Sequence, residues 1–312
     1  MAEIYDRRAG KMFTGGTYGQ SGLRLAYSSR LGRVIVGGLI TRRWFSRLAT
    51  WPARSRASRR QIPEFVTRLG IDESEFAKTE FASFADFFVR DLKPGARPLD
   101  PDPARLIAPA DSKLTVYPIA EDLTVSIKGY DYGVAELVGG AERLAGVEMV
   151  GGAGTGGETE AVGRAEVFPW THCLVFRLSV DDFHRYCFID DCRIGSTYAL
   201  GGRLHTVGEW SDGRARILAE NHRVVTFLST ARFGQVAVIE VGALLVGQII
   251  NHQLAEAARG QEKGYFGYGG STIVVLIGGV EIDPDITEQS ERGIETRVRR
   301  GEGIGKWDRG TV

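Results

Sequence analysis

From about residue 105 onward the chain is a series of short apolar runs rich in β-branched residues, with turn-forming residues between them. Runs of this length and composition are typical of β-strands. Because strands need partners in a sheet, the series predicts a mainly antiparallel β body, either a sheet or a barrel-like arrangement. The clearest runs are KLTVYPI, LTVSIKGY, HCLVFRLSV, RVVTFLST, GQVAVIEVGALLVGQII and STIVVLIGG.

The first hundred residues have a different pattern, in which apolar residues and arginines alternate at roughly helical spacing. Residues 23–48 predict a basic amphipathic helix, which either lies on a lipid surface or packs on the body. Two further helical stretches, SRRQIPEFVTRLGIDESEF and SFADFFVRDL, end at the proline-rich KPGARPLDPDP, the clearest boundary in the chain. The predicted fold class is therefore α+β, with a helical region 1–100 followed by a β body from residue 101.

Charge is distributed unevenly along the 312 residues, although the chain as a whole is neutral. Residues 1–60 contain thirteen Lys or Arg against two acids, a net +11, so the remainder carries −11. A basic arm on an acidic body predicts an anionic partner, either a membrane surface or a nucleic acid. A membrane is favoured, because no nucleic-acid-binding motif accompanies the arginines and Trp44, Phe45 and Trp51 suit a lipid interface.

Cysteine and histidine usage excludes several kinds of site. Cys173, Cys187 and Cys192 form no CxxC pair and leave an odd number, which argues against a disulfide framework and favours a reducing compartment. The five histidines show no spacing such as HExxH, so no metal site is predicted. The best candidate for a membrane span, VIVGGLI, is far shorter than the roughly 20 residues a helix needs.

The stretch GYFGYGGSTIVVLIGG places glycines and Ser271 directly before an apolar run. The plain interpretation is a tight turn into a strand. A second interpretation is chemical: Gly270 has no Cβ, so its carbonyl can be strained and closely approached. Attack by a deprotonated Ser271 hydroxyl would convert the amide to an ester, and β-elimination would then break the chain. The serine would become a dehydroalanine that hydrolyses to a pyruvoyl group.

Several motifs resemble the phosphatidylserine decarboxylase family and occur in that family's order. They are SFADFFVRDLKPGARPLD, PADS, SIKGYDYGVAELVGG, DDFHR, EVGALLVGQI and YGGST, followed by a terminal VRRGEGIGKW. The resemblance implies a proenzyme that cleaves itself between Gly270 and Ser271 and carries a pyruvoyl cofactor derived from Ser271. The products would be an α/β heterodimer of residues 1–270 and 271–312, with a β-rich body over 101–270 and the short segment completing the same sheet.

The activity that the resemblance implies is decarboxylation of phosphatidylserine to phosphatidylethanolamine, through a Schiff base between the substrate amine and the pyruvoyl ketone. Self-cleavage in the family uses an Asp-His-Ser arrangement, which falls on Asp111, His184 and Ser271. Asp111 would orient the imidazole, His184 would take the proton and Ser271 would attack. The family pattern has a second histidine three residues after the first, and Cys187 stands at that position.

Cys187 leaves three alternatives open. His184 serves as the base itself, which we favour because no other histidine lies in the matching motif. Alternatively, His205 or His222 reaches the site from a neighbouring strand. In the third, the chain is an inactive or unprocessed lipid-binding relative, and a related serine phospholipid also stays open as substrate.

The expected partners are phosphatidylserine in anionic membranes and the chain's own cleaved subunit, with no nucleic acid and with a homodimer left open. The expected location is peripheral, at the cytoplasmic face of the cell membrane. Each Lys or Arg near an anionic leaflet contributes about 1 kcal/mol, so a few of the thirteen basic residues are enough for attachment.

Overall fold

The computed structural model describes residues 3–14, 41, 43–145, 170–205, 216–243, 248–267 and 271–308. A ten-stranded sheet is built from β1 (Glu3–Asp6), β2 (Lys11–Thr14), β4 (Ser112–Pro118), β7 (His172–Leu178), β9 (Cys192–Leu200), β10 (Arg223–Thr230), β11 (Gln235–Gly242), β13 (Glu256–Ala257), β15 (Ser271–Ile277) and β17 (Glu295–Val298). Their spatial order is β13-β9-β10-β11-β15-β7-β4-β17-β1-β2, and only the β1–β17 pair is parallel.

The predicted α+β class with a mainly antiparallel body is confirmed, and the predicted runs form β4, β7, β10, β11 and β15. Within the described residues the sheet ends at β13 on one side and at β2 on the other, so it is open rather than a closed barrel. The smaller strands are β3 (Arg105–Ile107), β5 (Thr124–Ile127), β6 (Tyr130–Gly133), β8 (Arg185–Cys187), β12 (Ile249–Asn251), β14 (Glu262–Phe266), β16 (Val280–Ile282) and β18 (Gly303–Trp307).

Strand β15 lies near the middle of the sheet, between β11 and β7, and every residue in it is buried. Its sequence STIVVLI is apolar without alternation, as expected for a strand covered on both faces. Ile273 and Val275 pack into one core, whereas Val274 and Leu276 pack into a second core on the opposite face. The segment that begins at Ser271 also supplies β17, so it enters the sheet at two places.

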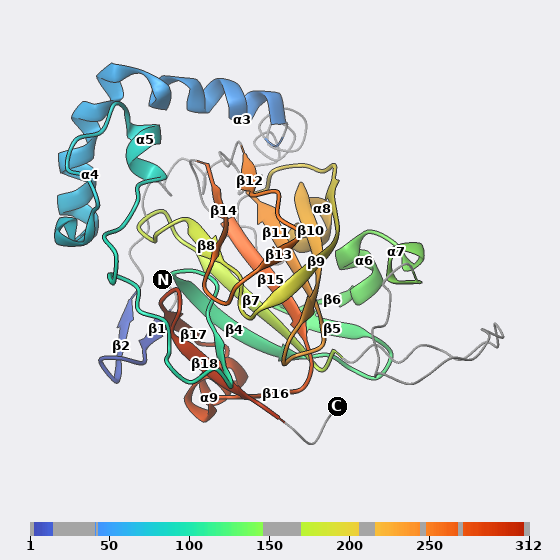
Figure 1. Cartoon of the computed structure of the whole chain (residues 1–312). Helices are drawn as coiled ribbons and strands as arrows, with labels where there is room; N and C mark the ends of the chain where they lie inside the picture. The colour runs from blue at the N-terminus through green and yellow to red at the C-terminus, as the bar shows by residue number, and fades with distance from the viewer. Residues whose placement is uncertain are drawn as a thin grey trace.

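The helical part of the N-terminal region lies between residues 43 and 88 and forms an arc beside the β body (Figure 1). Its phenylalanines, including Phe87 and Phe88, form a third core. The helices are α3 (Arg43–Thr50), α4 (Ile62–Leu69) and α5 (Phe84–Phe88), with the short 3₁₀ helices η2 (Trp51–Arg54), η3 (Arg56–Gln61) and η4 (Glu73–Glu75) between them. The remaining helices are α6 (Val134–Val138), α7 (Ala141–Ala145), α8 (Ile217–Glu220) and α9 (Pro284–Glu291).

The N-terminal part of the predicted helical region 1–100 differs from the prediction. Residues 3–14 are strands rather than helix, because β1 pairs with β17 and so extends the sheet. Most of the helix predicted over residues 23–48 lies outside the described residues, and only its end falls within α3. The side chains of Trp44 and Phe45 also lie outside them. Among the helices that the structure describes, none has the length and apolar character needed to cross a bilayer.

Candidate active site

Ser271 is the first residue of β15, where it pairs with Gly242 on β11 and with Leu178 on β7. Its side chain is fully buried, and its hydroxyl oxygen has no hydrogen-bond partner among the described residues. A buried polar group without a partner costs about 1–3 kcal/mol, so such a group needs a reason to be there. Gly270, the predicted cleavage partner, lies outside the described residues.

His184 follows the loop that leaves β7 at Leu178 and is also fully buried. Its Nδ1 lies 2.9 Å from the backbone carbonyl oxygen of Asp182, and its ring packs 4.3 Å from that of Phe88, centroid to centroid. Because a carbonyl oxygen only accepts hydrogen bonds, Nδ1 carries the proton and Nε2 carries the lone pair. Nε2 is buried and has no partner within the described part of the chain.

The electrostatics of this position favour a neutral imidazole. Burial lowers the pKa of His184 to about 3, and the nearby positive charge of Arg90 acts in the same direction. At neutral pH the ring is therefore uncharged, which is the form that a general base requires.

Two short connections bring Ser271 and His184 to the same end of the sheet. Leu178 pairs with Ser271 and begins the loop that reaches His184. From the other side, the Phe266 amide donates a hydrogen bond of 3.0 Å to the His184 carbonyl, and Phe266 ends the strand that precedes Ser271. The structure thus gathers a hydroxyl donor and an imidazole acceptor, both buried and both unsatisfied. No hydrogen bond joins them among the described residues.

Asp111 is not paired with the imidazole. Its carboxylate accepts hydrogen bonds from Arg97, with Nη2 at 2.7 Å and Nε at 2.9 Å, and from the Arg300 amide at 2.9 Å. This two-pronged guanidinium contact satisfies the carboxylate, as is usual for Arg–carboxylate pairs. The expected contact from Asp111 to His184 is therefore not seen, and the Asp182 carbonyl occupies the Nδ1 position instead.

A buried ion pair that was not predicted from the sequence holds residues 179–184, the histidine loop, in place. Lys113 Nζ lies 2.6 and 2.8 Å from the two carboxylate oxygens of Asp182, which also accepts the Ser179 amide at 2.7 Å. Burial raises the pKa of Asp182 to about 6, against the opposing effect of Lys113. The acidic DDFH motif was the available signal, but it did not identify Lys113 on β4 as the partner.

Cys187 stands where the second family histidine was expected. It is buried, its amide donates to the Pro109 carbonyl at 2.9 Å, and burial raises the pKa of its thiol. The thiol is thus neutral at physiological pH and does not replace a basic imidazole. Because Pro109 lies two residues before Asp111, the amide hydrogen bond places the Cys187 backbone beside the turn that carries Asp111. All three cysteines are buried and free.

Of the two alternative bases, His205 also lies at the Ser271 end of the sheet, and its ring Nε2 lies 3.8 Å from the Glu220 carboxylate. Asn221 links the His205 backbone to the carbonyl of Gly242, the strand partner of Ser271, and both His205 ring nitrogens are buried without a hydrogen bond in the described residues. His222 Nδ1 instead contacts the Leu200 carbonyl at 2.8 Å. The described residues contain no group of three or more His, Cys, Asp or Glu that could hold a metal ion.

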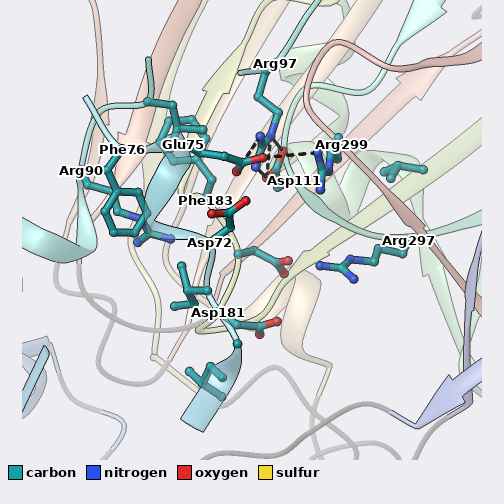
Figure 2. A pocket seen from close by; sticks show the side chains of 16 residues that line it. Asp72, Glu75, Phe76, Arg90, Arg97, Asp111, Asp181, Phe183, Arg297 and Arg299 are labelled. Carbon is teal, nitrogen blue, oxygen red and sulfur yellow. Dashed lines mark hydrogen bonds and ion pairs between the residues drawn. The ribbon is translucent and has the colours of Figure 1, made fainter. Parts of the chain in front are cut away.

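A polar cavity of about 120 Å³ lies between the helical region and the loop that carries His184. Figure 2 shows Arg90 and Phe76 on one side of it and the Arg97–Asp111–Arg299 group on the other. Its wall is formed by Leu69, Gly70, Ile71, Asp72, Glu75, Phe76, Arg90, Leu92, Arg97, Asp111, Asp181, Asp182, Phe183, Arg297, Val298 and Arg299. Residues from five stretches of the chain, within 69–76, 90–97, 111, 181–183 and 297–299, therefore line a space beside the loop that leads to the buried histidine.

Comparison with known proteins identifies the family. The phosphatidylserine decarboxylase family model matches residues 84–306, and the chain belongs to this family of carboxy-lyases. It is 40% identical to phosphatidylserine decarboxylase proenzyme 2 of Clostridium acetobutylicum, over 97% of this chain and 98% of the relative. It is 34% identical to a phosphatidylserine decarboxylase proenzyme of Desulfitobacterium hafniense, over 98% of both chains. A Chlamydia felis proenzyme is 35% identical, over 97% of both.

Burial of His184 predicts a loss of stability at acidic pH. The ordinary histidine pKa of 6.5 applies to the unfolded chain, whereas burial lowers the pKa to about 3 in the folded state. Between these values the unfolded state binds more protons, so this group lowers the free energy of unfolding by about 1.4 kcal/mol per pH unit of acidification. Asp182, with its raised pKa, acts in the opposite direction below about pH 6.

The contribution of His184 is isolated by comparing His184→Gln with its parent, both in a Ser271→Ala background that keeps the chain intact. Urea unfolding at about pH 7 and about pH 5 should show a smaller acid-induced loss in His184→Gln than in the parent. Equal losses in the two proteins would contradict a buried, neutral imidazole.

Proposed function

We propose that this protein is a self-processing phosphatidylserine decarboxylase. In this proposal the chain is cut between Gly270 and Ser271, Ser271 becomes a pyruvoyl group, and the processed enzyme converts phosphatidylserine to phosphatidylethanolamine and carbon dioxide. The observation that carries the proposal is the pair of buried, unsatisfied atoms, Ser271 Oγ and His184 Nε2, at one end of the sheet. Family membership and the proenzyme names of the relatives support it.

In the proposed self-cleavage, His184 Nε2 accepts the hydroxyl proton as Ser271 Oγ bonds to the Gly270 carbonyl carbon. The C–N bond then breaks, and the proton passes to the nitrogen of Ser271, which leaves an ester. Removal of the Ser271 α-proton expels the Gly270 carboxylate and leaves a dehydroalanine. Water then replaces its nitrogen, so that ammonia departs and a pyruvoyl group remains.

The residues around this pair have supporting roles in the proposal. The Asp182 carbonyl holds the tautomer that leaves Nε2 free and stabilises the imidazolium as it forms. The Lys113–Asp182 ion pair keeps the loop in place. Asp111 acts as a positioning residue, because it connects Arg97 and the Arg300 backbone to the turn before β4.

The residues also fit a pyruvoyl group at position 271. Among the described residues the Ser271 oxygen has no hydrogen-bond partner, so it can be exchanged for another polar group, and the fully buried β15 anchors the new end. When formed, the group supplies an electron sink for an amine substrate. His184 would then exchange a proton with the substrate carbon, and burial would exclude water. Because the segment from Ser271 forms the central strand β15 and also β17, we propose that the two subunits remain associated after cleavage.

The proposed activity is tested with purified protein and phosphatidylserine vesicles, by measuring released carbon dioxide and the lipid product. Cleaved protein that releases carbon dioxide is the expected result, and diacyl and ether-linked serine lipids in parallel would define the substrate. Vesicle binding by an uncleaved chain without carbon dioxide release would instead support the inactive lipid-binding alternative.

We also propose that the helical region attaches the enzyme peripherally to the cytoplasmic face of the cell membrane. Trp51 and Leu48 are 71% and 63% exposed, which is unusual for large apolar side chains. The arginines of η2 and η3 are exposed beside them, at Arg54, Arg56, Arg59 and Arg60. Exposed aromatic and basic residues together are typical of a surface that binds anionic lipid.

Charge reversal in this surface should release the protein from vesicles. Arg59→Glu combined with Arg60→Glu is expected to weaken binding to phosphatidylserine vesicles by at least about tenfold at low salt, because each charge contributes about 1 kcal/mol. Added salt should weaken binding of the parent protein. Arg292→Glu, at the exposed residue that caps the C-terminal end of α9, is the control and should bind like the parent in a sedimentation assay. Equal binding by all three proteins would contradict the assignment of this surface.

A further inference from the structure

Arg90 is a buried cation that forms no ion pair within the described part of the chain. Its side chain is only 3% exposed, and no carboxylate lies within ion-pair distance of it among the described residues. Its guanidinium lies over the rings of Phe76 and Phe87, at 5.0 and 4.8 Å from their centroids. The only hydrogen bond it makes there is a long one of 3.5 Å from Nη1 to the Phe87 carbonyl, and Nε has none. Burying a charge in this way is costly unless an anion compensates it.

Each carboxylate in the cavity wall contacts a basic or polar group other than Arg90. Four of them have a basic side chain within 4 Å, and Asp72 is exposed at the rim, where it accepts the Ser74 amide. The pairs are Asp111–Arg97 at 2.7 Å, Glu75–Arg97 at 2.9 Å, Asp182–Lys113 at 2.6 Å and Asp181–Lys113 at 3.6 Å. None of these four acids forms an ion pair with Arg90; each has its basic contact elsewhere.

The other arginines of the wall have partners as well. Arg299 lies 3.4 Å from Glu75, and Arg297 lies 3.5 Å from Asp6. Within the described wall, Arg90 is thus the cation left without an anion. The cavity, at about 120 Å³, exceeds the roughly 10–15 Å³ that one water needs and can admit a small anionic group.

The position of Arg90 relates this cavity to the proposed reaction. Arg90 follows α5, whose Phe88 packs against His184, and Asp182 and Phe183 of the histidine loop line the same cavity. We propose that Arg90 binds the phosphodiester of the substrate headgroup and so places the serine moiety beside Ser271. This assignment rests on the proposed function, to which it adds Arg90 as a substrate-binding residue.

The phosphodiester suits Arg90 better than the substrate carboxylate does. A guanidinium that held the carboxylate would stabilise the group that must lose its charge as carbon dioxide leaves, and would oppose the reaction. A phosphodiester keeps its charge throughout, so its binding lowers the energies of substrate and transition state alike. Guanidinium and phosphate also match in geometry.

The binding test uses Ser271→Ala protein, which does not depend on processing. Its melting temperature is measured with inorganic phosphate, glycerophosphoserine or free serine, against chloride at equal ionic strength. Phosphate and glycerophosphoserine should raise the melting temperature, and Arg90→Met should remove this response while Arg292→Met retains it. Without anion, Arg90→Met should melt at or above its parent, because an unpaired buried charge has been removed.

Several outcomes would overturn the proposal. They are no response to phosphate in the parent, an unchanged response in Arg90→Met, and a response to free serine alone, which would assign Arg90 to the carboxylate. Arg90→Lys keeps the positive charge and should retain part of the melting-temperature response to phosphate. This variant therefore distinguishes loss of the charge from loss of the fold as the cause of the missing response in Arg90→Met.

A second readout uses processed enzyme. Arg90→Met should raise KM for phosphatidylserine at least about tenfold, with a smaller change in kcat, because uniform binding is lost. An unchanged KM would contradict the role of Arg90. Absence of decarboxylation in the parent would instead contradict the proposed function, and the anion response of the uncleaved protein would still be measurable.

Discussion

Ser271→Ala is expected to abolish chain cleavage and leave a single intact chain of 312 residues. Alanine removes the attacking oxygen, and no other hydroxyl can form the ester that precedes chain scission. The fold should persist, because the lost hydroxyl has no hydrogen-bond partner among the described residues and the position is otherwise buried in β15. Denaturing mass analysis measures the cleavage, and circular dichroism measures the fold.

Ser271→Cys is the conservative comparison, since a thiol retains nucleophilic character and should allow some cleavage. Complete cleavage of the alanine variant would refute Ser271 as the nucleophile. Loss of the folded spectrum in that variant would refute the expectation that the hydroxyl has no structural role.

The second large effect is expected for His184→Ala, which should slow self-cleavage by a factor of about 10² to 10⁴, the usual contribution of a general base. The reason is that Nε2 of His184, at the Ser271 end of the sheet, has no hydrogen-bond partner among the described residues and is free to accept the proton. The rate is measured from the fraction cleaved over time after synthesis.

His172→Ala is the matched control, because His172 pairs with Ile277 at the opposite end of β15 and should not affect the rate. His205→Ala tests the alternative base. A normal rate for His184→Ala together with a block in His205→Ala would contradict the assignment of His184.

Much of the β architecture could be predicted from the sequence, because β15 contains the apolar run IVVLI and β11 is rich in Val, Ile and Ala, as expected for buried strands. Their order in the sheet could not, since pairing such as β1 with β17 joins segments nearly 300 residues apart, which no local pattern encodes. The α+β class therefore followed from local composition, whereas the topology required the three-dimensional structure.

The candidate site could likewise be predicted only in part from the sequence. Ser271 and His184 are predicted from the family resemblance, and the structure buries both at the same end of the sheet. The expected contact of Asp111 with the imidazole was not found, because Arg97 binds the carboxylate and a backbone carbonyl orients the ring. Backbone acceptors carry no sequence signal. The absence of an ion pair at Arg90 among the described residues could not be predicted from the sequence either, because it depends on which carboxylates the other basic side chains contact.

The central claim is that the chain cuts itself before Ser271 and converts that residue to a cofactor. Intact-mass measurement of the purified wild-type protein under denaturing conditions tests it most directly. The account predicts two chains, residues 1–270 and a short chain whose mass fits residues 271–312 with a pyruvoyl group in place of the N-terminal serine. The two should elute together under native conditions, since β15 lies between β11 and β7. A single uncleaved chain would contradict the account.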